Sequence, residues 1–144
     1  MKPPPSLKTA MTPFPYAVER TAPLAEARHM MDAHEVRHLP VIDGHELVGI
    51  VTDRDVRSVL SPPIGRRVAD DLTVADVYVP DAYVVDLNEP IEDVLLTMAE
   101  QRTDAAVVTR KGRLAGVFTS VDACRSFAEH IRENFPRPDG DAAA

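Results

Sequence analysis

The chain has 144 residues, 44% of them apolar, and a formal net charge of −7. This apolar content is sufficient for a folded core, whereas the acidic balance argues against a general nucleic-acid binder, which needs a basic surface. No apolar run approaches the roughly 18 residues that span a bilayer, so membrane association is not expected.

The first ten residues contain three consecutive prolines, and we predict a flexible or extended lead-in over residues 1–10. A helix is predicted from Pro23, because proline suits the first turn and the apolar residues after it recur at helical spacing. These apolar residues are Leu24, Ala27 and Met31.

A β-hairpin is predicted next. Residues 37–42 and 47–52 are rich in apolar and β-branched side chains, and they flank Asp43-Gly44, a pair typical of tight hairpin turns. A further helix is expected to begin near Asp55.

The segment 61–76 begins with Ser-Pro-Pro-Ile-Gly and is predicted to be a linker. In the next predicted helix, Asn88 is expected to be the cap and Pro90 to lie just inside the first turn. The apolar stripe of this helix consists of Ile91, Val94, Leu95 and Met98.

A second hairpin is expected from residues 105–109 and 114–119, which flank the turn Lys111-Gly112. A last helix should begin near Asp122. Residues 132–144 are rich in proline, glycine and alanine at their end and are predicted to form a C-terminal tail.

These elements belong to an internal repeat. Residues 49–55 (GIVTDRD) align with residues 116–122 (GVFTSVD) at an offset of 67 residues, and the register holds upstream without a gap. The repeats are placed at 11–60 and 77–131. The predicted fold is therefore α/β (α+β), with two pseudo-symmetric β-α-β-β-α repeats packed sheet against sheet.

The repeats resemble the CBS domain family, named for cystathionine beta-synthase. Residues 37–43 (RHLPVID) followed by residues 49–55 are close to the family's pattern, and Met11-Thr12-Pro13 is similar to its usual start. The resemblance covers residues 11–131 and makes the pair similar to a Bateman module. As a stand-alone pair, the chain is similar to small bacterial proteins associated with acetoin utilisation.

This resemblance implies a non-catalytic regulatory module that requires no cofactor. Its ligand would be AMP, ADP, ATP or S-adenosylmethionine, bound between the repeats, with occupancy signalled by conformational or dimer rearrangement. The implied partners are a second copy of the chain and an unidentified regulated protein. The single cysteine, Cys124, and the absence of a recognisable secretory leader favour the cytoplasm.

In this family a Thr-x-x-Asp segment contacts ribose, which implies this role for Thr52 and Asp55 and for Thr119 and Asp122. The chemistry is suitable, since a carboxylate can accept hydrogen bonds from two hydroxyls. The same pattern is also a helix-capping arrangement that needs no ligand, so both interpretations remain open.

The remaining ligand contacts are also implied by the resemblance. Positive charge for a phosphate would come from Arg37, His38, Arg54 and Arg57. Apolar walls for adenine would be Ala17, Val18, Leu39 and Pro40 in one site, and Val84, Val85, Ala105 and Ala106 in the other. Each arginine has the alternative of being an ordinary surface charge.

The two predicted sites differ in charge. Arg54 and Arg57 fall on Val121 and Cys124 in the second repeat, where Arg125 is one position out of register. Because arginine is well suited to bind phosphate, a phosphorylated ligand is expected to prefer the first site.

Two other functions compete with ligand binding. Residues 34–38 spell His-Glu-x-x-His, the helical zinc-hydrolase motif, but Pro40 disfavours a helix through His38, so a metal-dependent enzyme is not expected. A ligand-free dimerisation or interaction scaffold is the stronger competitor, with an apolar helix face such as Val56, Val59 and Leu60 serving a partner.

Overall fold

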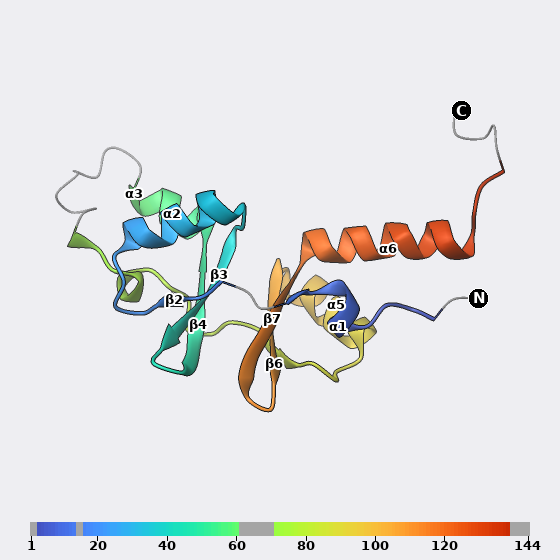
Figure 1. Cartoon of the computed structure of the whole chain (residues 1–144), viewed down its shortest axis with the longest axis horizontal. Coiled ribbons are helices and arrows are strands. Elements are labelled where there is room, and N and C mark those ends of the chain that lie inside the picture. Colours follow the sequence, from blue (N-terminus) through green and yellow to red (C-terminus); the bar gives the residue numbers. More distant parts are fainter. Residues whose placement is uncertain (1–2, 14–15, 61–70, 139–144) are drawn as a thin grey trace.

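The computed structural model describes residues 3–13, 16–60 and 71–138. Two β-sheets lie side by side, and each has helices on the face turned away from the other (Figure 1). The strand orders are β2-β3-β4 and β1-β7-β6-β5. The strands are β1 (Thr12–Pro13), β2 (Val18–Glu19), β3 (His38–Asp43), β4 (Glu46–Thr52), β5 (Val84–Asp86), β6 (Ala105–Arg110) and β7 (Arg113–Thr119). The helices are α1 (Leu7–Ala10), α2 (Leu24–His34), α3 (Asp53–Leu60), the 3-10 helix η1 (Val74–Asp76), α5 (Ile91–Gln101) and α6 (Ser120–Asn134).

The predicted repeat unit is confirmed. Strands β2 and β3 pair in parallel across the connecting helix α2, and β3 and β4 form an antiparallel hairpin that leads into α3. Strands β5, β6 and β7 repeat this topology with α5 and α6. We call the segment from β2 to α3 the first repeat and that from β5 to α6 the second repeat.

Both hairpins turn through left-handed backbone conformations. Gly44 has φ 66°, while Lys111 and Gly112 have φ 52° and 77°. Glycine adopts such angles without the steric penalty that a Cβ imposes. The turns predicted at Asp43-Gly44 and Lys111-Gly112 are therefore in place.

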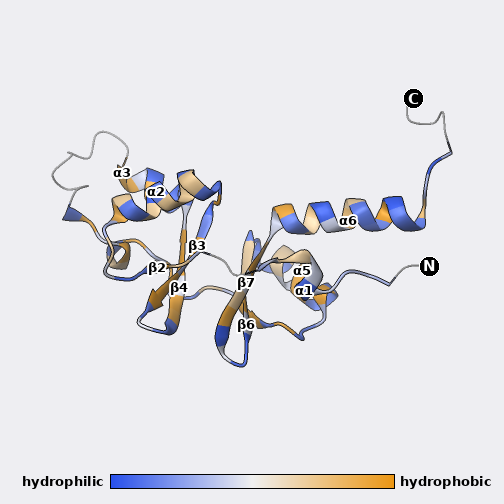
Figure 2. Ribbon diagram, viewed as in Figure 1, coloured by the Kyte–Doolittle hydropathy of each residue, from blue (hydrophilic) through white to orange (hydrophobic). Residues whose placement is uncertain are grey.

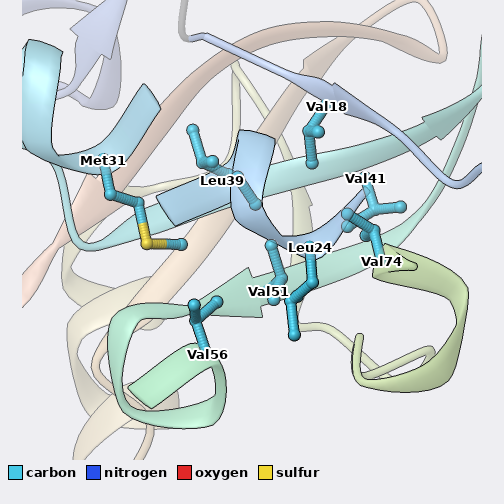
Figure 3. Close-up of a cluster of buried hydrophobic side chains, with 9 residues drawn as sticks. Val18, Leu24, Met31, Leu39, Val41, Val51, Val56 and Val74 are labelled. Carbon is cyan, nitrogen blue, oxygen red and sulfur yellow. The ribbon is translucent and has the colours of Figure 1, made fainter. Parts of the chain in front are cut away.

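Each sheet buries one face against its own helices. The first core consists of Val18, Leu24, Ala27, Met31, Leu39, Val41, Val51, Val56 and Val74 (Figure 3). The second core consists of Leu7, Val85, Val94, Met98, Ala106, Val108 and Phe118. The opposite sheet faces meet in a third cluster of Ile50, Ala105, Val107 and Val117, so the sheets pack against one another as predicted.

Each repeat receives an extended segment from in front of the other repeat. β1 pairs antiparallel with β7, placing Thr12 opposite Val117. In the same way Val79 pairs with Ile50 of β4, with N–H to O distances of 2.8 and 3.0 Å. This reciprocal exchange ties the two repeats together through the backbone as well as through the third cluster.

The lead-in prediction is partly wrong, because α1 forms within residues 1–10 and its Leu7 is only 1% exposed in the second core. The end of the predicted linker is also structured, since Val74 of η1 is buried in the first core. α6 continues three residues into the predicted tail, to Asn134. Residues 61–70 and 139–144, the rest of the linker and of the tail, lie outside the described residues.

The predicted cap of α5 is wrong. The N-cap position is Pro90, which makes no side-chain cap hydrogen bond. Asn88 lies two residues upstream in a turn, where its backbone N–H donates to the Asp86 carboxylate at 2.9 Å. Pro23 occupies the same N-cap position in α2, so the two repeats enter their first helices alike.

The helix face proposed for a scaffold partner is inside the molecule. Val56 is fully buried in the first core, and Val59 and Leu60 pack against it. Across the described ranges, none of the helices has the length and apolar character needed to cross a bilayer.

Candidate ligand-binding groove between the repeats

A groove with a volume of about 1190 Å³ lies between the repeats, where the hairpins end and α3 and α6 begin. This volume is ample for a nucleotide. The predicted site residues that line it are Arg37, His38, Thr52, Arg54, Asp55, Thr119 and Asp122. Its other lining residues are Thr12, Pro13, Tyr16, His34, Glu35, Val36, Asp53, Asp104, Val117, Ser120, Val121 and Arg125.

The strand register explains why the two motifs reach the same groove. His38 and Thr52 face each other at the end of the β3–β4 hairpin, and Ala105 and Thr119 do so at the matching end of β6 and β7. Since the sheets pack face to face, both Thr-x-x-Asp segments open between them.

In the first motif, the Thr52 hydroxyl donates to Asp55 Oδ2 at 2.8 Å and accepts from the Asp55 backbone N–H at 3.2 Å. The Thr side chain therefore caps α3. Asp55 is partly exposed, and among the described contacts its Oδ1 has no hydrogen-bond partner. That oxygen is available to a ligand hydroxyl.

The second motif is more fully engaged. Asp122 Oδ2 accepts from the backbone N–H and the hydroxyl of Thr119, at 3.0 and 3.1 Å. The Thr119 hydroxyl accepts from the Asp122 N–H at 3.3 Å, which completes a capping box. Arg125 contacts Asp122 Oδ1 at 3.5 Å, and Asp122 is only 5% exposed. Both carboxylate oxygens of Asp122 thus have protein partners.

The arginines divide between the groove and the outer surface. Arg37 and Arg54 line the groove, as does Arg125 from the second repeat. Arg57 does not line it, and the prediction of a ligand contact there is wrong. Its Nε lies 3.0 Å from Asp53 Oδ2, one helical turn earlier, so it forms an intrahelical pair on the exposed side of α3.

The predicted adenine walls are not part of the groove. Val18 and Leu39 are buried in the first core, and Val85 and Ala106 in the second. Alternate residues of a strand point to opposite sheet faces, so the neighbours of a groove residue such as His38 face the core. The other four, Ala17, Pro40, Val84 and Ala105, also lie outside the lining, and Ala105 belongs to the cluster between the sheets.

An aromatic pair on one side of the groove was not predicted. The rings of Tyr16 and His34 stack at a centroid distance of 3.5 Å with an interplanar angle of 7°. Tyr16 lies just before β2, and His34 is the last residue of α2. The repeat offers a partial signal, because Tyr16 falls on Tyr83, but nothing local pairs either ring with His34.

The His-Glu-x-x-His segment does not lie on one helix. α2 ends at His34, Glu35 adopts a left-handed conformation with φ 54°, and His38 begins β3. A zinc motif needs both histidines on one helical face. No cluster of three or more potential metal-binding side chains was found within the described ranges.

His38 has the perturbed ionisation in this groove. Burial lowers its pKa below the ordinary value of 6.5, and Arg37 acts in the same direction. Asp104 and Asp53 oppose this and raise the pKa, but burial prevails. His38 is therefore favoured in its neutral form in the folded protein.

We predict a pH-dependent stability from His38. The unfolded chain binds a proton at this residue more readily than the folded chain, so folding stability falls as pH drops below 6.5 toward the lower folded pKa. Urea denaturation at a series of pH values should show this decline, and His38→Gln should flatten it. His45→Gln, in an exposed turn, is the matched control and should keep the wild-type slope. A His38→Gln profile that coincides with wild type would contradict the assignment.

Both repeats match the CBS domain family, over residues 7–62 and 74–129. The chain belongs to the CBS domain family. Its two domains form a tandem pair, a Bateman module. Each matched range starts before the parallel strands and so includes the segment that pairs with the other repeat, β1 in one case and Val79 in the other.

Relatives include both enzymes and small proteins. L-aspartate semialdehyde sulfurtransferase of Methanocaldococcus jannaschii is 27% identical over 123 residues, which are 84% of this chain and 23% of the enzyme. The uncharacterized protein YlbB of Bacillus subtilis is 41% identical over 113 residues, which are 75% of this chain and 71% of YlbB. The chain thus spans less than a quarter of the enzyme and most of YlbB.

Solved structures share the fold of the pair. A Vibrio cholerae protein assigned to acetoin utilization (AcuB) has a TM-score of 0.77 at 23% identity, with 94% of this chain and 100% of that chain covered. The CBS domain pair of protein MJ0100, in complex with 5-methylthioadenosine and S-adenosylmethionine, has a TM-score of 0.75 at 23% identity and covers 89% and 99%. CBSX2 in complex with AMP has a TM-score of 0.75 at 24% identity and covers 88% and 98%.

Proposed function

We propose that this protein is a non-catalytic regulatory module of the cytoplasm that binds an adenosine-type ligand in the groove between its CBS domains. The ligand class comprises AMP, ADP, ATP and S-adenosylmethionine. One observation carries the proposal: the Thr-x-x-Asp segments of both repeats and three arginines open onto the same groove of about 1190 Å³. CBS pairs of this fold in complex with AMP and with S-adenosylmethionine support the ligand class.

The first motif is the proposed ribose site. Asp55 has a free carboxylate oxygen among the described contacts, whereas both oxygens of Asp122 accept from protein donors. Arg54 and Arg37 lie beside Asp55 on the same groove and, within the described chain, form no ion pair. A phosphate at this position would gain charge-assisted hydrogen bonds from either guanidinium.

Regulation follows from where the groove lies. A ligand that touches α3 of the first repeat and α6 of the second stabilises the arrangement of repeats that brings its contacts together. We propose that the module acts as a homodimer and that a regulated protein reads this change. A ligand shifts such an equilibrium only by the difference in its affinity for the two arrangements.

The test is calorimetric titration of the purified protein with AMP, ADP, ATP and S-adenosylmethionine, with and without magnesium, and with GMP as a base control. Saturable binding of one adenosine compound, with GMP silent, is the expected result. Silence across the adenosine panel in folded protein would overturn the proposal. It would favour the ligand-free scaffold, for which the exposed apolar side of α6 supplies a surface.

A further inference from the structure

The final helix, α6, has its apolar side turned to solvent. Val121, Phe127 and Phe135 are 62%, 66% and 62% exposed, and Ile131 is exposed on the same side. The residues of α6 turned toward the body are polar and partly buried: Ser126, His130 and Asn134. A surface helix ordinarily buries its apolar stripe and exposes its polar face. α6 does the reverse along a helix that projects beyond the sheets (Figures 1 and 2).

The exposed stripe has the spacing of a helix that packs against another helix. Its members alternate at intervals of three and four residues, which is the average period of 3.5 that keeps a seam facing a partner helix. They are Val121, Cys124, Ala128, Ile131 and Phe135. Phe127 widens the stripe on one side, and Arg125 and Arg132 border it on the other.

Helix α5 extends this apolar surface. Leu96 is 64% exposed, and Leu95 lines a hollow of about 390 Å³ between α5 and the start of α6, together with Cys124. The exposed carboxylates Glu92 and Glu100 lie one turn before and one turn after Leu96 on α5. We call this surface of α5 and α6 the second-repeat face.

The first repeat has no such surface. At the offset of 67 residues, the counterparts of Leu95, Leu96, Val121 and Cys124 are Arg28, His29, Arg54 and Arg57. All four of these counterparts are exposed. Burying charged side chains against an apolar surface without partners is unfavourable. An apolar face on one repeat therefore does not suit the matching face of the other.

We propose that the second-repeat face is the dimer interface and that it packs against the same face of a second copy, related by a two-fold axis. This rests on the homodimer of the proposed function and adds its orientation: second repeat on second repeat. A two-fold pairing brings identical surfaces together, so apolar meets apolar. It also lets Arg125 and Arg132 of one copy approach Glu92 and Glu100 of the other, a complementary charge arrangement.

The mass of the protein in solution tests this pairing. Sedimentation velocity should give a dimer for wild type, and a monomer for Leu96→Glu and for Phe127→Glu at the same concentration. His29→Glu, the first-repeat counterpart of Leu96, is the matched control and should remain a dimer. These side chains are exposed, so melting followed by circular dichroism should show folded variants. A monomeric wild type would overturn the proposal, as would dissociation by His29→Glu but not by Leu96→Glu.

Cys124 supplies an independent test, because it is the chain's one cysteine and belongs to the second-repeat face. A short bis-maleimide should give a covalent dimer on a denaturing gel, and Phe127→Glu and Cys124→Ser should abolish it. A solution dimer that yields no covalent product would overturn the pairing, since each Cys124 would then face a different surface. Titration of the same variants with the nucleotide panel keeps the two proposals apart. Loss of ligand binding with an intact dimer would count against the sensor alone.

Discussion

Replacing Gly49 by valine is expected to lower the free energy of unfolding by about 1–3 kcal/mol, the usual range for overpacking a filled site. A Cβ at Gly49 would overlap the carbonyl oxygen of Val79 and lie 2.7 Å from the Tyr78 ring. Neither can move easily, because Val79 is held to Ile50 by two backbone hydrogen bonds of 2.8 and 3.0 Å. Relief of the overlap would break the exchanged segment away from β4.

The pseudo-symmetry supplies a second copy of this experiment. At Gly116 a Cβ would lie 2.6 Å from the Met11 sulfur and 2.7 Å from the Thr12 carbonyl oxygen, where β1 crosses β7. Gly116→Val should therefore resemble Gly49→Val in urea denaturation. Glu46→Val introduces the same side chain at an exposed position of β4 and should change the free energy of unfolding little. Equal stability of Gly49→Val and Glu46→Val would show that Val79 does not cross β4 at Gly49.

The repeat glycine illustrates how far the sequence could predict the fold. The offset of 67 residues aligned Gly49 with Gly116 and gave the hairpins, the helices and the sheet-on-sheet packing. It did not give the purpose of the glycines, because the segment that crosses each one comes from in front of the other repeat. Pairing between Thr12 and Val117 leaves no periodic signal in either segment. The same long-range contact explains why residues 7–10 were taken for a flexible lead-in.

The candidate site was predicted well at its helix starts and poorly at its walls. A Thr-x-x-Asp segment defines its own geometry within four residues, so the placement of Thr52 and Asp55 followed from the sequence. The walls were assigned without applying the alternation of a strand. Once His38 faces the groove, Leu39 must face the core, and the structure places it there. Arg57 failed for a similar reason, because its position on α3 favours the pair with Asp53.

Replacing Asp55 by alanine is expected to weaken binding of the adenosine ligand by about 1.5–3 kcal/mol, roughly tenfold or more in Kd, if its carboxylate holds the ribose. The free energy of unfolding should fall less, because the Thr52 hydroxyl still accepts from the backbone N–H of residue 55 and caps α3. Calorimetric titration and urea denaturation of the same preparation measure the two effects. Unchanged affinity in a folded variant would remove Asp55 from the site.

The matched variant Asp122→Ala should show the opposite balance. Asp122 is buried and accepts from Thr119 and Arg125, so its removal leaves those donors without their carboxylate and should destabilise the fold by about 1–3 kcal/mol. Its effect on affinity should be smaller than that of Asp55→Ala, since neither of its oxygens is free for a ligand. Equal loss of affinity in both variants would instead mean that the ligand displaces Arg125 and uses both motifs. The asymmetry of one groove therefore separates a ribose-binding carboxylate from a capping one by experiment.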